Sequence, residues 1–555
     1  MKGDYSRDTF DPRNHYTRVL MQQGRVLMDA DWNEQTSIVL HYLQTLARDL
    51  IGPYGMPWDS QGFMIMPRVE GTPKRITDIE IGFGRYYVDG ILCEMDRPVA
   101  YFQQPDYSLD PVNRTEDRLP EPPFLVYLDV WERHITAIED PRIREVALGG
   151  PDTAARTRIV WQVKVKSWEE LDLSFPPADV KCELGGLVDR VMASLIEDLP
   201  NPFEWGVALA ARAQIPDIDS ADPCVVSPEA RYRGAENQLY RVEIHRGGEV
   251  GDANNGATFK WSRDTVVLPI ISISSETVSL EHLGRDARSS VEVGDWVEVI
   301  DDDYVLRGTA DPLMRVESVG IDDLQVTLSA RPRFGHERSK HPFLRVWHHR
   351  KGDPTQGGLE IANDGAALVV EGEDAWLNLE DGVQIRFSTI SATYFPGNYW
   401  LIPARTATGD VEWPLTREGE PKELEPRGIL HHYAPLALVL RGPVAAGAFA
   451  ITDLRHSMQP TASCCPVIRI ATPGTVAAGQ QVTFSVFLSN TINVVTGLTF
   501  SWQITGGTPA TATGPSSSIT VTPNANVRVV EAKVTIEGLP PNCPDKATGK
   551  CLVIT

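Results

Sequence analysis

Hydrophobic and polar positions near the start of the chain alternate with the period of an α-helix. Asp31 can cap the helix start, and Glu34 three residues later completes a capping-box pattern. Gly52 and Pro53 predict the helix end. Apolar residues at spacings of three, four and seven positions form a single stripe along this helix: Trp32, Val39, Leu43, Leu46 and Leu50.

This stripe has two interpretations. An amphipathic helix can pack on its own domain, or it can serve as a docking element for a partner. Docking is favoured by position, since the helix precedes every β-rich segment that could enclose it. Just before it, residues 16–27 read as two short β-prone runs separated at Gly24.

The next part of the chain, residues 56–235, has the pattern of β-structure with one helix. Residues 79–94 predict a hairpin with a tight turn at Asp89-Gly90. Residues 124–131 form an apolar strand, and residues 161–166 alternate as a half-buried strand. An apolar stripe over residues 184–199 predicts a core-packing helix that ends at Pro200.

Residues 236–350 show strands at intervals of about ten residues, which is typical of a small barrel or sandwich. The first strand alternates cleanly, with Tyr240, Val242 and Ile244 on one face and polar residues on the other. The later strands are expected at residues 265–272, 276–280, 295–300, 313–319 and 324–328. Residues 351–462 continue as a β-rich domain, with alternation at 383–387.

The last ninety or so residues, 463–555, alternate most regularly. Three runs around Phe484, Trp502 and Val534 have the period of strands, and a tryptophan on a central strand is typical of an immunoglobulin-like sandwich. The expected fold class is therefore mainly β and multidomain, with a helical docking segment at residues 1–55 and a β-sandwich or barrel body. An immunoglobulin-like domain follows at the C-terminus.

Several runs carry a resemblance to a known family: FDPRNHYTRVLMQQGRVLMDADWNEQ (10–35), GRYYVDGILCE (84–94), ENQLYRVEIH (236–245), ATFKWSRD (257–264), GDWVEV (294–299), YWLIPARTATGDVEWP (399–414) and HHYAPLALV (431–439). They resemble an uncharacterised bacterial family encoded beside the baseplate genes of phage-tail-like contractile injection systems. The N-terminus is also similar, more loosely, to N-terminal modules of phage tail-fibre and baseplate proteins. The C-terminal domain resembles the polycystic-kidney-disease (PKD) type.

Charge narrows the range of partners. The chain has 52 basic and 75 acidic residues, a net charge of −23, which argues against nucleic acid and anionic membranes as partners. Residues 466–555 depart from this balance, with five basic and three acidic side chains, so a domain boundary is expected near residue 463. No stretch is apolar enough to span a bilayer, and no signal peptide is visible. Synthesis in the cytoplasm is expected, with exposure outside the cell only through a particle or lysis.

Four cysteines gather in the C-terminal domain and can form disulfides in an oxidising setting: Cys464, Cys465, Cys543 and Cys551. The remaining three, Cys93, Cys182 and Cys224, are scattered and read as buried thiols. No Cys-x-x-Cys pair is present, so a structural zinc site has little support.

The sequence contains partial matches to catalytic and metal-binding motifs, but each lacks a required feature. His336 and His341 lie five residues apart, whereas a zinc-protease helix needs a spacing of four. The pairs His348-His349 and His431-His432 would point to opposite faces of a strand and cannot share a metal. Residues 301–303, three aspartates, read as a solvated turn because Leu306 and Pro312 occupy the positions of the calcium-loop glycine and glutamate. Gly82 and Gly84 begin a dinucleotide fingerprint that lacks its third glycine and its helix.

We therefore expect no catalytic centre, no metal and no cofactor. The resemblance implies a structural component of a contractile particle, as a baseplate-associated protein, fibre or adaptor. Its expected partners are baseplate, sheath or spike subunits and further copies of itself, with a cell-surface glycan or envelope as a further candidate. Two other classes stay open: a particle-borne or secreted carbohydrate-active enzyme, and a stand-alone adhesive or glycan-binding protein.

Overall fold

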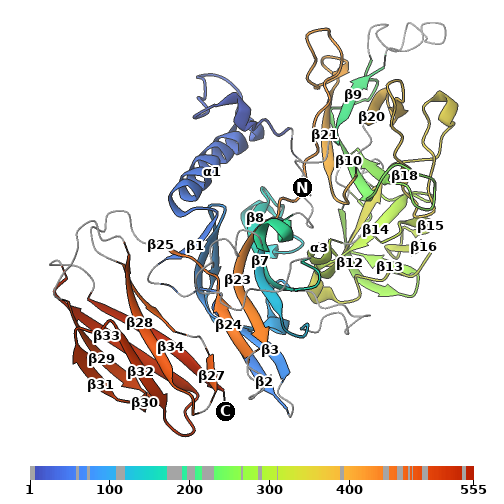
Figure 1. The fold of residues 1–555 in the computed structure, drawn as a ribbon. Coiled ribbons are helices and arrows are strands. Elements are labelled where there is room, and N and C mark those ends of the chain that lie inside the picture. Colours follow the sequence, from blue (N-terminus) through green and yellow to red (C-terminus); the bar gives the residue numbers. More distant parts are fainter. Residues whose placement is uncertain are drawn as a thin grey trace, which may run out of the picture.

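The computed structural model describes residues 5, 7–57, 60, 62–71, 75–107, 119–171, 191–196, 207–214, 231–263, 267–284, 290–308, 311–387, 393–441, 449–458, 467–472, 475–477, 479–489, 498–539 and 545–554. It is mainly β, with many separate sheets and an N-terminal helix, as the hydrophobic pattern predicts (Figure 1).

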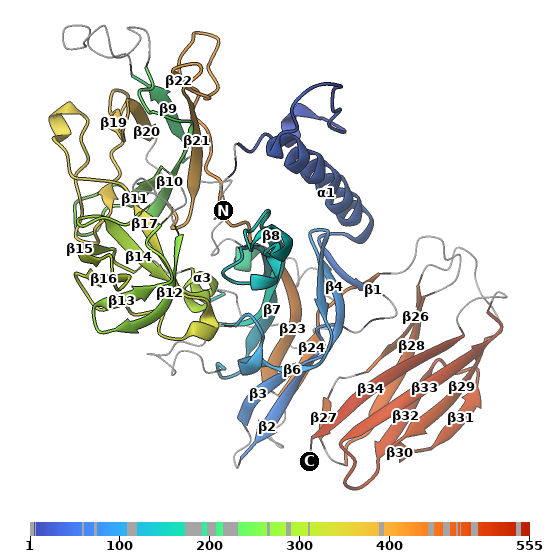
Figure 2. The same cartoon turned by 180° about the vertical axis from the view of Figure 1, so that it is seen from behind.

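The N-terminal helix, α1 (Asp29–Ile51), projects from the body and joins it at the helix C-terminal end (Figures 1 and 2). It ends at Gly52, whose φ of 90° is a conformation that glycine adopts without strain. Near this end, the carbonyl oxygen of Gln44 would lie 2.1 Å from a Cβ atom at Gly90, so the helix packs closely on the turn at residues 89–90. Arg48 also pairs with Asp89 at 3.4 Å, and α1 is therefore fixed in direction.

The predicted helix start was wrong. The helix begins at Asp29, after an extended Met28, and no side chain caps it. Asp29 and Asp31 both lie in the first turn, where the helix dipole favours negative charge. Glu34 does not complete a capping box, and instead accepts a hydrogen bond of 2.5 Å from the Thr9 hydroxyl.

The predicted β-runs at residues 16–27 were also wrong, because no strand forms there. Gly24, with a φ of 71°, lies in a turn as the break predicted. The segment is held to α1 through a hydrogen bond of 2.8 Å from the Val19 N–H to the Gln35 side chain. Strand-forming residues without a neighbouring sheet edge have no partner for their backbone groups, so local propensity alone did not suffice.

The first body unit combines segments far apart in the sequence. Strand β23 (His432–Arg441) pairs with β7 (Phe124–Ile135), and the short β25 pairs in parallel with β1. The sheet orders are β25-β1-β4-β5, β2-β3-β6 and β24-β23-β7-β8. The other strands are β1 (Tyr54–Pro57), β2 (Ile65–Glu70), β3 (Arg75–Ile81), β4 (Gly84–Val88), β5 (Ile91–Met95), β6 (Val99–Ala100), β8 (Arg156–Ser167), β24 (Phe449–Asp453) and β25 (Ser457–Met458).

Within this unit the predicted hairpin is present as β4 and β5, which pair across the turn at Asp89 and Gly90. Both turn residues have positive φ, 47° and 81°, as a tight two-residue hairpin loop requires. Of the helix predicted at residues 184–199, residues 191–196 are described and are helical, while the others lie outside the described residues. Its described apolar residues Val191, Met192 and Leu195 are buried, as a core-packing helix predicts.

The second body unit places a five-stranded sheet, β18-β11-β10-β21-β22, beside a three-stranded one, β19-β20-β9. One face of β10 carries Tyr240, Val242 and Ile244 into a large apolar core, as the alternation predicts. The strands are β9 (Leu209–Ala213), β10 (Gln238–Arg246), β11 (Thr258–Ser262), β18 (Ala367–Leu368), β19 (Leu377–Asn378), β20 (Val383–Phe387), β21 (Tyr399–Arg405) and β22 (Asp410–Val411).

A closed six-stranded barrel, β12-β13-β16-β15-β14-β17, lies within residues 267–347. This resolves the choice between barrel and sandwich for that segment, and five of its strands fall close to the predicted positions. The strands are β12 (Val267–Ser274), β13 (Thr277–Leu280), β14 (Trp296–Ile300), β15 (Met314–Gly320), β16 (Gln325–Leu328) and β17 (Phe343–Trp347). One-turn 3-10 helices are found at Pro12–Asn14, Tyr101–Gln103, Pro141–Ile143, Val146–Leu148, Arg338–Lys340 and Pro354–Gln356.

The aspartates at residues 301–303 were predicted as a solvated turn, which was wrong. They begin a short helix, α3 (Asp302–Arg307), and Asp301 caps it by accepting the Tyr304 N–H at 3.0 Å. Asp302 pairs with Arg133 of β7, and Asp303 pairs with Lys340 at 3.1 Å. The Asp302–Arg133 pair thus joins the barrel to β7, whereas the partners of Asp301 and Asp303 lie within the barrel segment itself.

The C-terminal unit is a two-sheet sandwich, with orders β26-β28-β32-β30 and β27-β34-β33-β29-β31. The predicted alternation is confirmed, since Phe484, Trp502 and Val534 all point into its core. The strands are β26 (Val467–Ala471), β27 (Thr475–Ala477), β28 (Val482–Ser489), β29 (Thr499–Thr505), β30 (Gly507–Thr508), β31 (Thr511–Gly514), β32 (Ser518–Pro523), β33 (Val529–Glu537) and β34 (Lys546–Ile554).

Because this sandwich has its own core, we expect a fragment of residues 463–555 to fold alone and to unfold cooperatively. Its deletion should leave the rest of the chain folded. Circular dichroism and hydrogen exchange on the fragment check this, and a disordered fragment would show that the sandwich depends on the body.

Candidate functional site

The first candidate site is the apolar stripe of α1. All five predicted docking residues lie on the helix with their side chains between 48 and 77 % exposed: Trp32, Val39, Leu43, Leu46 and Leu50. The buried residues of α1 are Ala30 and Ile38, which lie on another side of the helix. The stripe therefore faces away from the body instead of packing on it.

Exposed apolar side chains are concentrated around this stripe. Among the described residues, 13 of the 28 large hydrophobic side chains that are exposed lie within residues 16–50. Besides the stripe, they include six on the preceding segment and two more on the helix: Tyr16, Leu20, Met21, Val26, Leu27, Met28, Leu40 and Tyr42. We call these 13 side chains the apolar docking surface. Soluble proteins rarely expose many large apolar groups together unless a partner covers them.

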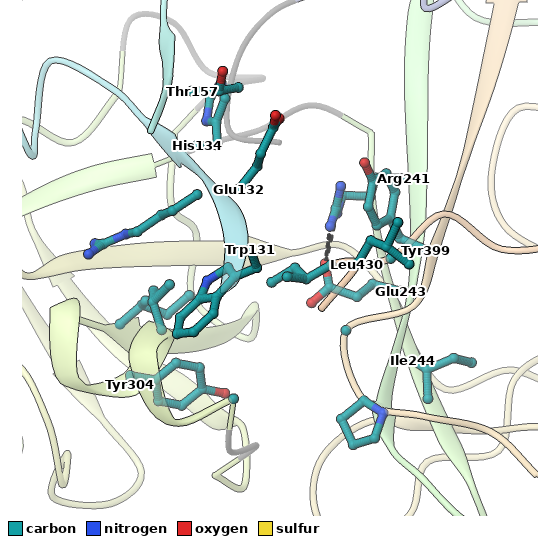
Figure 3. A pocket seen from close by; sticks show the side chains of 18 of the residues that line it. Trp131, Glu132, His134, Thr157, Arg241, Glu243, Ile244, Tyr304, Tyr399 and Leu430 are labelled. Atoms are coloured by element: carbon teal, nitrogen blue, oxygen red, sulfur yellow. Dashed lines mark hydrogen bonds and ion pairs between the residues drawn. The ribbon is translucent and has the colours of Figure 1, made fainter. Parts of the chain in front are cut away.

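The second candidate site is a cavity of about 600 Å³ that the sequence did not predict. It lies where α1, β7, β10 and the barrel meet, and it includes Leu40 and His41 of α1 among its walls. Figure 3 shows Trp131 of β7 and Tyr304 of α3 on one side of it, with Arg241 and Glu243 of β10 on the other. Ile429 and Leu430 on its rim are exposed, so solvent can reach it.

Strand register explains the charges in this cavity. Glu243 of β10 lies opposite Lys260 of β11, and Glu298 of β14 lies opposite Arg345 of β17. The neighbours Val297, Val299, Leu344 and Val346 fill the barrel, so Glu298 and Arg345 point outward, toward the polar face of β10 and β11. The two pairs of opposite charge therefore face each other between the sheet and the barrel.

The contacts form one buried ionic network. Arg241 donates to Glu243 from Nε at 2.7 Å and from Nη2 at 2.6 Å. Lys260 donates to both oxygens of Glu298 at 2.9 Å and lies 3.4 Å from Glu243. Arg345 Nη1 lies 3.7 Å from Glu243. All five side chains are buried. In such a buried network, any charged or polar group without a partner costs stability.

Two aromatic groups complete the network around Glu298. The Trp347 indole donates to this carboxylate at 3.2 Å, and the Tyr304 hydroxyl donates to its other oxygen. Burial alone raises the pKa of Glu298 and of Glu243, but the neighbouring cations outweigh burial and hold both pKa values below their ordinary range. Both carboxylates are therefore ionised at neutral pH.

Three cations balance only two carboxylates here, and some donors have no acceptor. Among the described residues, no hydrogen-bond partner is found for Nε and Nη2 of Arg345, Nη1 of Arg241 or Nδ1 of His245. These three residues are at least 93 % buried and line the cavity. Within the described residues, the network therefore leaves these donors without acceptors, while Glu132 adds a third carboxylate to the cavity wall.

Four histidines of the motifs considered above contact separate partners, although only His432 among them lies on a strand. His431 pairs with Asp129 at 2.7 Å, and His432 pairs with Asp89 at 2.9 Å. His336 contacts the Pro332 carbonyl and His341 contacts Asp302. Within the described ranges, no group of three or more histidine, cysteine or acidic side chains is placed to hold a metal ion.

The stability of the folded protein should depend on pH through the buried side chain of His349. Burial lowers its pKa from the ordinary 6.5 to about 4, although its Nε2 contacts the Gly365 carbonyl at 2.8 Å. The unfolded chain then binds a proton more readily than the folded chain as the pH falls below 6.5. As the pH falls from 7 to 5, we therefore expect protonation of this histidine in the unfolded chain to lower the free energy of unfolding by about 2 kcal/mol.

The matched measurement is the protection of β17 from hydrogen exchange at both pH values, since a multidomain chain does not unfold in one step. His349→Gln should flatten the pH dependence, because glutamine cannot take up this proton and can still donate to the carbonyl. The control His15→Gln changes an exposed side chain and should keep the slope. Equal slopes in all three proteins would show that His349 does not titrate as its burial predicts.

Cys551 is a thiol buried in the sandwich core, and burial raises its pKa to about 11. Its three predicted disulfide partners, Cys464, Cys465 and Cys543, lie outside the described residues, so the pairing stays a prediction. Cys93 is a buried thiol, as predicted, while Cys182 and Cys224 also lie outside the described residues. No helix in the described part of the chain is long and apolar enough to cross a membrane.

Together, the fold and these sites define a multidomain β-rich protein with an exposed N-terminal helix and an internal charged cavity. The chain belongs to a family of unknown function, DUF6519, whose profile matches residues 1–176 and 205–488. The match covers α1 and the cavity walls but ends within β28, so most of the C-terminal sandwich lies beyond it. A search of the curated proteins found no match.

Proposed function

We propose that this protein is a structural component of a phage-tail-like contractile particle, attached through its N-terminal 52 residues. The observation that carries this proposal is the apolar docking surface on a helix fixed to the body by its C-terminal end. A helix with an open apolar stripe suits insertion into an apolar groove of a partner. The partner is a baseplate, sheath or spike subunit of the particle.

The resemblance of residues 10–35 to proteins encoded beside baseplate genes supports the same proposal. That run includes the first turn of α1 and much of the exposed segment before it. The resemblance therefore overlaps the apolar docking surface at seven of its 13 side chains, from Tyr16 to Trp32. In this proposal the β-rich units project from the particle, and the C-terminal sandwich is an immunoglobulin-like domain of the PKD type that acts as a spacer or attachment unit.

Purification of contractile particles from producing cells tests the proposal. The chain should sediment with the sheath and tube subunits and be absent from particles of a strain that lacks its gene. A chain recovered only away from intact particles would favour a stand-alone adhesive protein. Turnover of a polysaccharide by the purified chain, abolished by a single carboxylate substitution, would favour a carbohydrate-active enzyme instead.

A further inference from the structure

We propose that the cavity between β7, β10 and the barrel binds an acidic, sugar-sized molecule through its carboxylate or phosphate group. Arg241, His245 and Arg345 are buried residues of the cavity wall, and each carries a donor with no hydrogen-bond partner among the residues that the structure describes. A buried polar group without a partner is costly, and a buried cation costs more. An oxyanion supplies the missing acceptors.

Arginine geometry identifies the kind of group that fits. The Arg345 Nη1 atom faces Glu243, which leaves Nε and Nη2 on another edge of the guanidinium unpaired. Two N–H groups on one edge match the two oxygens of a carboxylate or phosphate. The guanidinium also lies 4.3 Å from the centre of the Trp347 ring, which restricts its orientation. The donors are therefore held in place before a ligand arrives.

The size and walls of the cavity indicate the rest of the ligand. A volume of about 600 Å³ lies within the usual range of small-molecule pockets. Trp131, Tyr304 and Tyr399 contribute aromatic surface to its walls, against which a sugar ring can pack (Figure 3). An acidic monosaccharide, free or at the end of a glycan, satisfies both the charged and the aromatic parts.

Titration calorimetry on the full chain tests this inference with four probes: glucuronate, glucose 6-phosphate, inorganic phosphate and neutral glucose. Binding of glucuronate identifies a carboxylate site, and binding of either phosphate identifies a phosphate site, so each supports the proposal. Glucose should bind at least about 10-fold more weakly than the acidic sugar that binds, because it has no anionic oxygens to pair with the arginines.

Two variants tie the binding to this cavity. Arg345→Met keeps an unbranched apolar stem but removes the guanidinium, and Glu243 retains Arg241 and Lys260, so the chain should fold. Its affinity for the acidic probe should fall about 10- to 100-fold. Leu430→Trp enlarges a side chain of the cavity wall without removing any charge of the ionic network and should also abolish binding. The control Ile321→Trp changes an exposed barrel residue away from the cavity and should bind as the wild type does.

Absence of binding for all three anions would overturn the proposal. So would glucose binding as tightly as glucuronate, or anion binding that is unchanged in both folded cavity variants. These measurements use the isolated protein, so they can succeed or fail independently of its attachment to a particle.

Discussion

Replacing Leu43, Leu46 and Leu50 with serine should abolish attachment of the protein to its particle while leaving the chain folded. These side chains are 59, 56 and 62 % exposed, so the free protein loses little core packing. Burying three leucines against a partner contributes roughly 4–9 kcal/mol before the costs of association. The measurement is co-sedimentation of the variant with purified particles, alongside circular dichroism of the free variant.

The matched control replaces Val146 and Leu148 with serine. These residues are 85 and 67 % exposed but lie on a short 3-10 turn of the body and not on α1. This variant should attach to the particle as the wild type does. A folded triple-serine variant that still attaches would contradict docking through this stripe, and a misfolded one would show that the stripe supports the protein's own fold.

Glu298→Gln should destabilise the contact between the barrel and β10 by about 3–5 kcal/mol, the usual cost of breaking a buried ion pair. The substitution keeps the shape of the side chain but removes a charge that faces Lys260 at 2.9 Å. The network would then hold three cations and one carboxylate. Because a multidomain chain does not unfold in one step, hydrogen exchange of β14 and β17 is the appropriate measurement.

Exposed Glu337 provides the control for this prediction, since Glu337→Gln removes the same charge from the barrel surface. That variant should exchange like the wild type, as expected for an isolated exposed charge. Unchanged protection of β14 and β17 in Glu298→Gln would show that the network contributes nothing to the barrel contact.

Local pattern predicted the elements whose partners lie nearby in the sequence. The Asp89-Gly90 turn follows from residues that tolerate positive φ, and the barrel strands follow from alternation between short turns. The pairing of β23 with β7 joins residues about 300 positions apart, for example His432 with Val130. No local pattern specifies such a pairing, because it depends on how complete sheets pack.

The two candidate sites also differ in whether they depend on local pattern or on contacts between distant segments. The stripe of α1 follows from helical spacing within about twenty residues, so its residues could be named before the structure was known. The cavity depends on Lys260 and Glu298 meeting across the contact between a sheet and a barrel. The available signal was the charged face of β10, Arg241, Glu243 and His245, on a strand whose other face is apolar. That alternation is equally typical of a solvent-exposed face, and only packing against the barrel distinguishes the two.

The most direct test of docking is a cryo-electron microscopy map of the intact contractile particle. Our account predicts density for the α1 helix, residues 29–51, with Trp32, Leu43 and Leu50 covered by a neighbouring subunit and the β-rich units projecting outward. A particle in which this helix is exposed to solvent, while another part of the chain makes the attachment, would contradict the account.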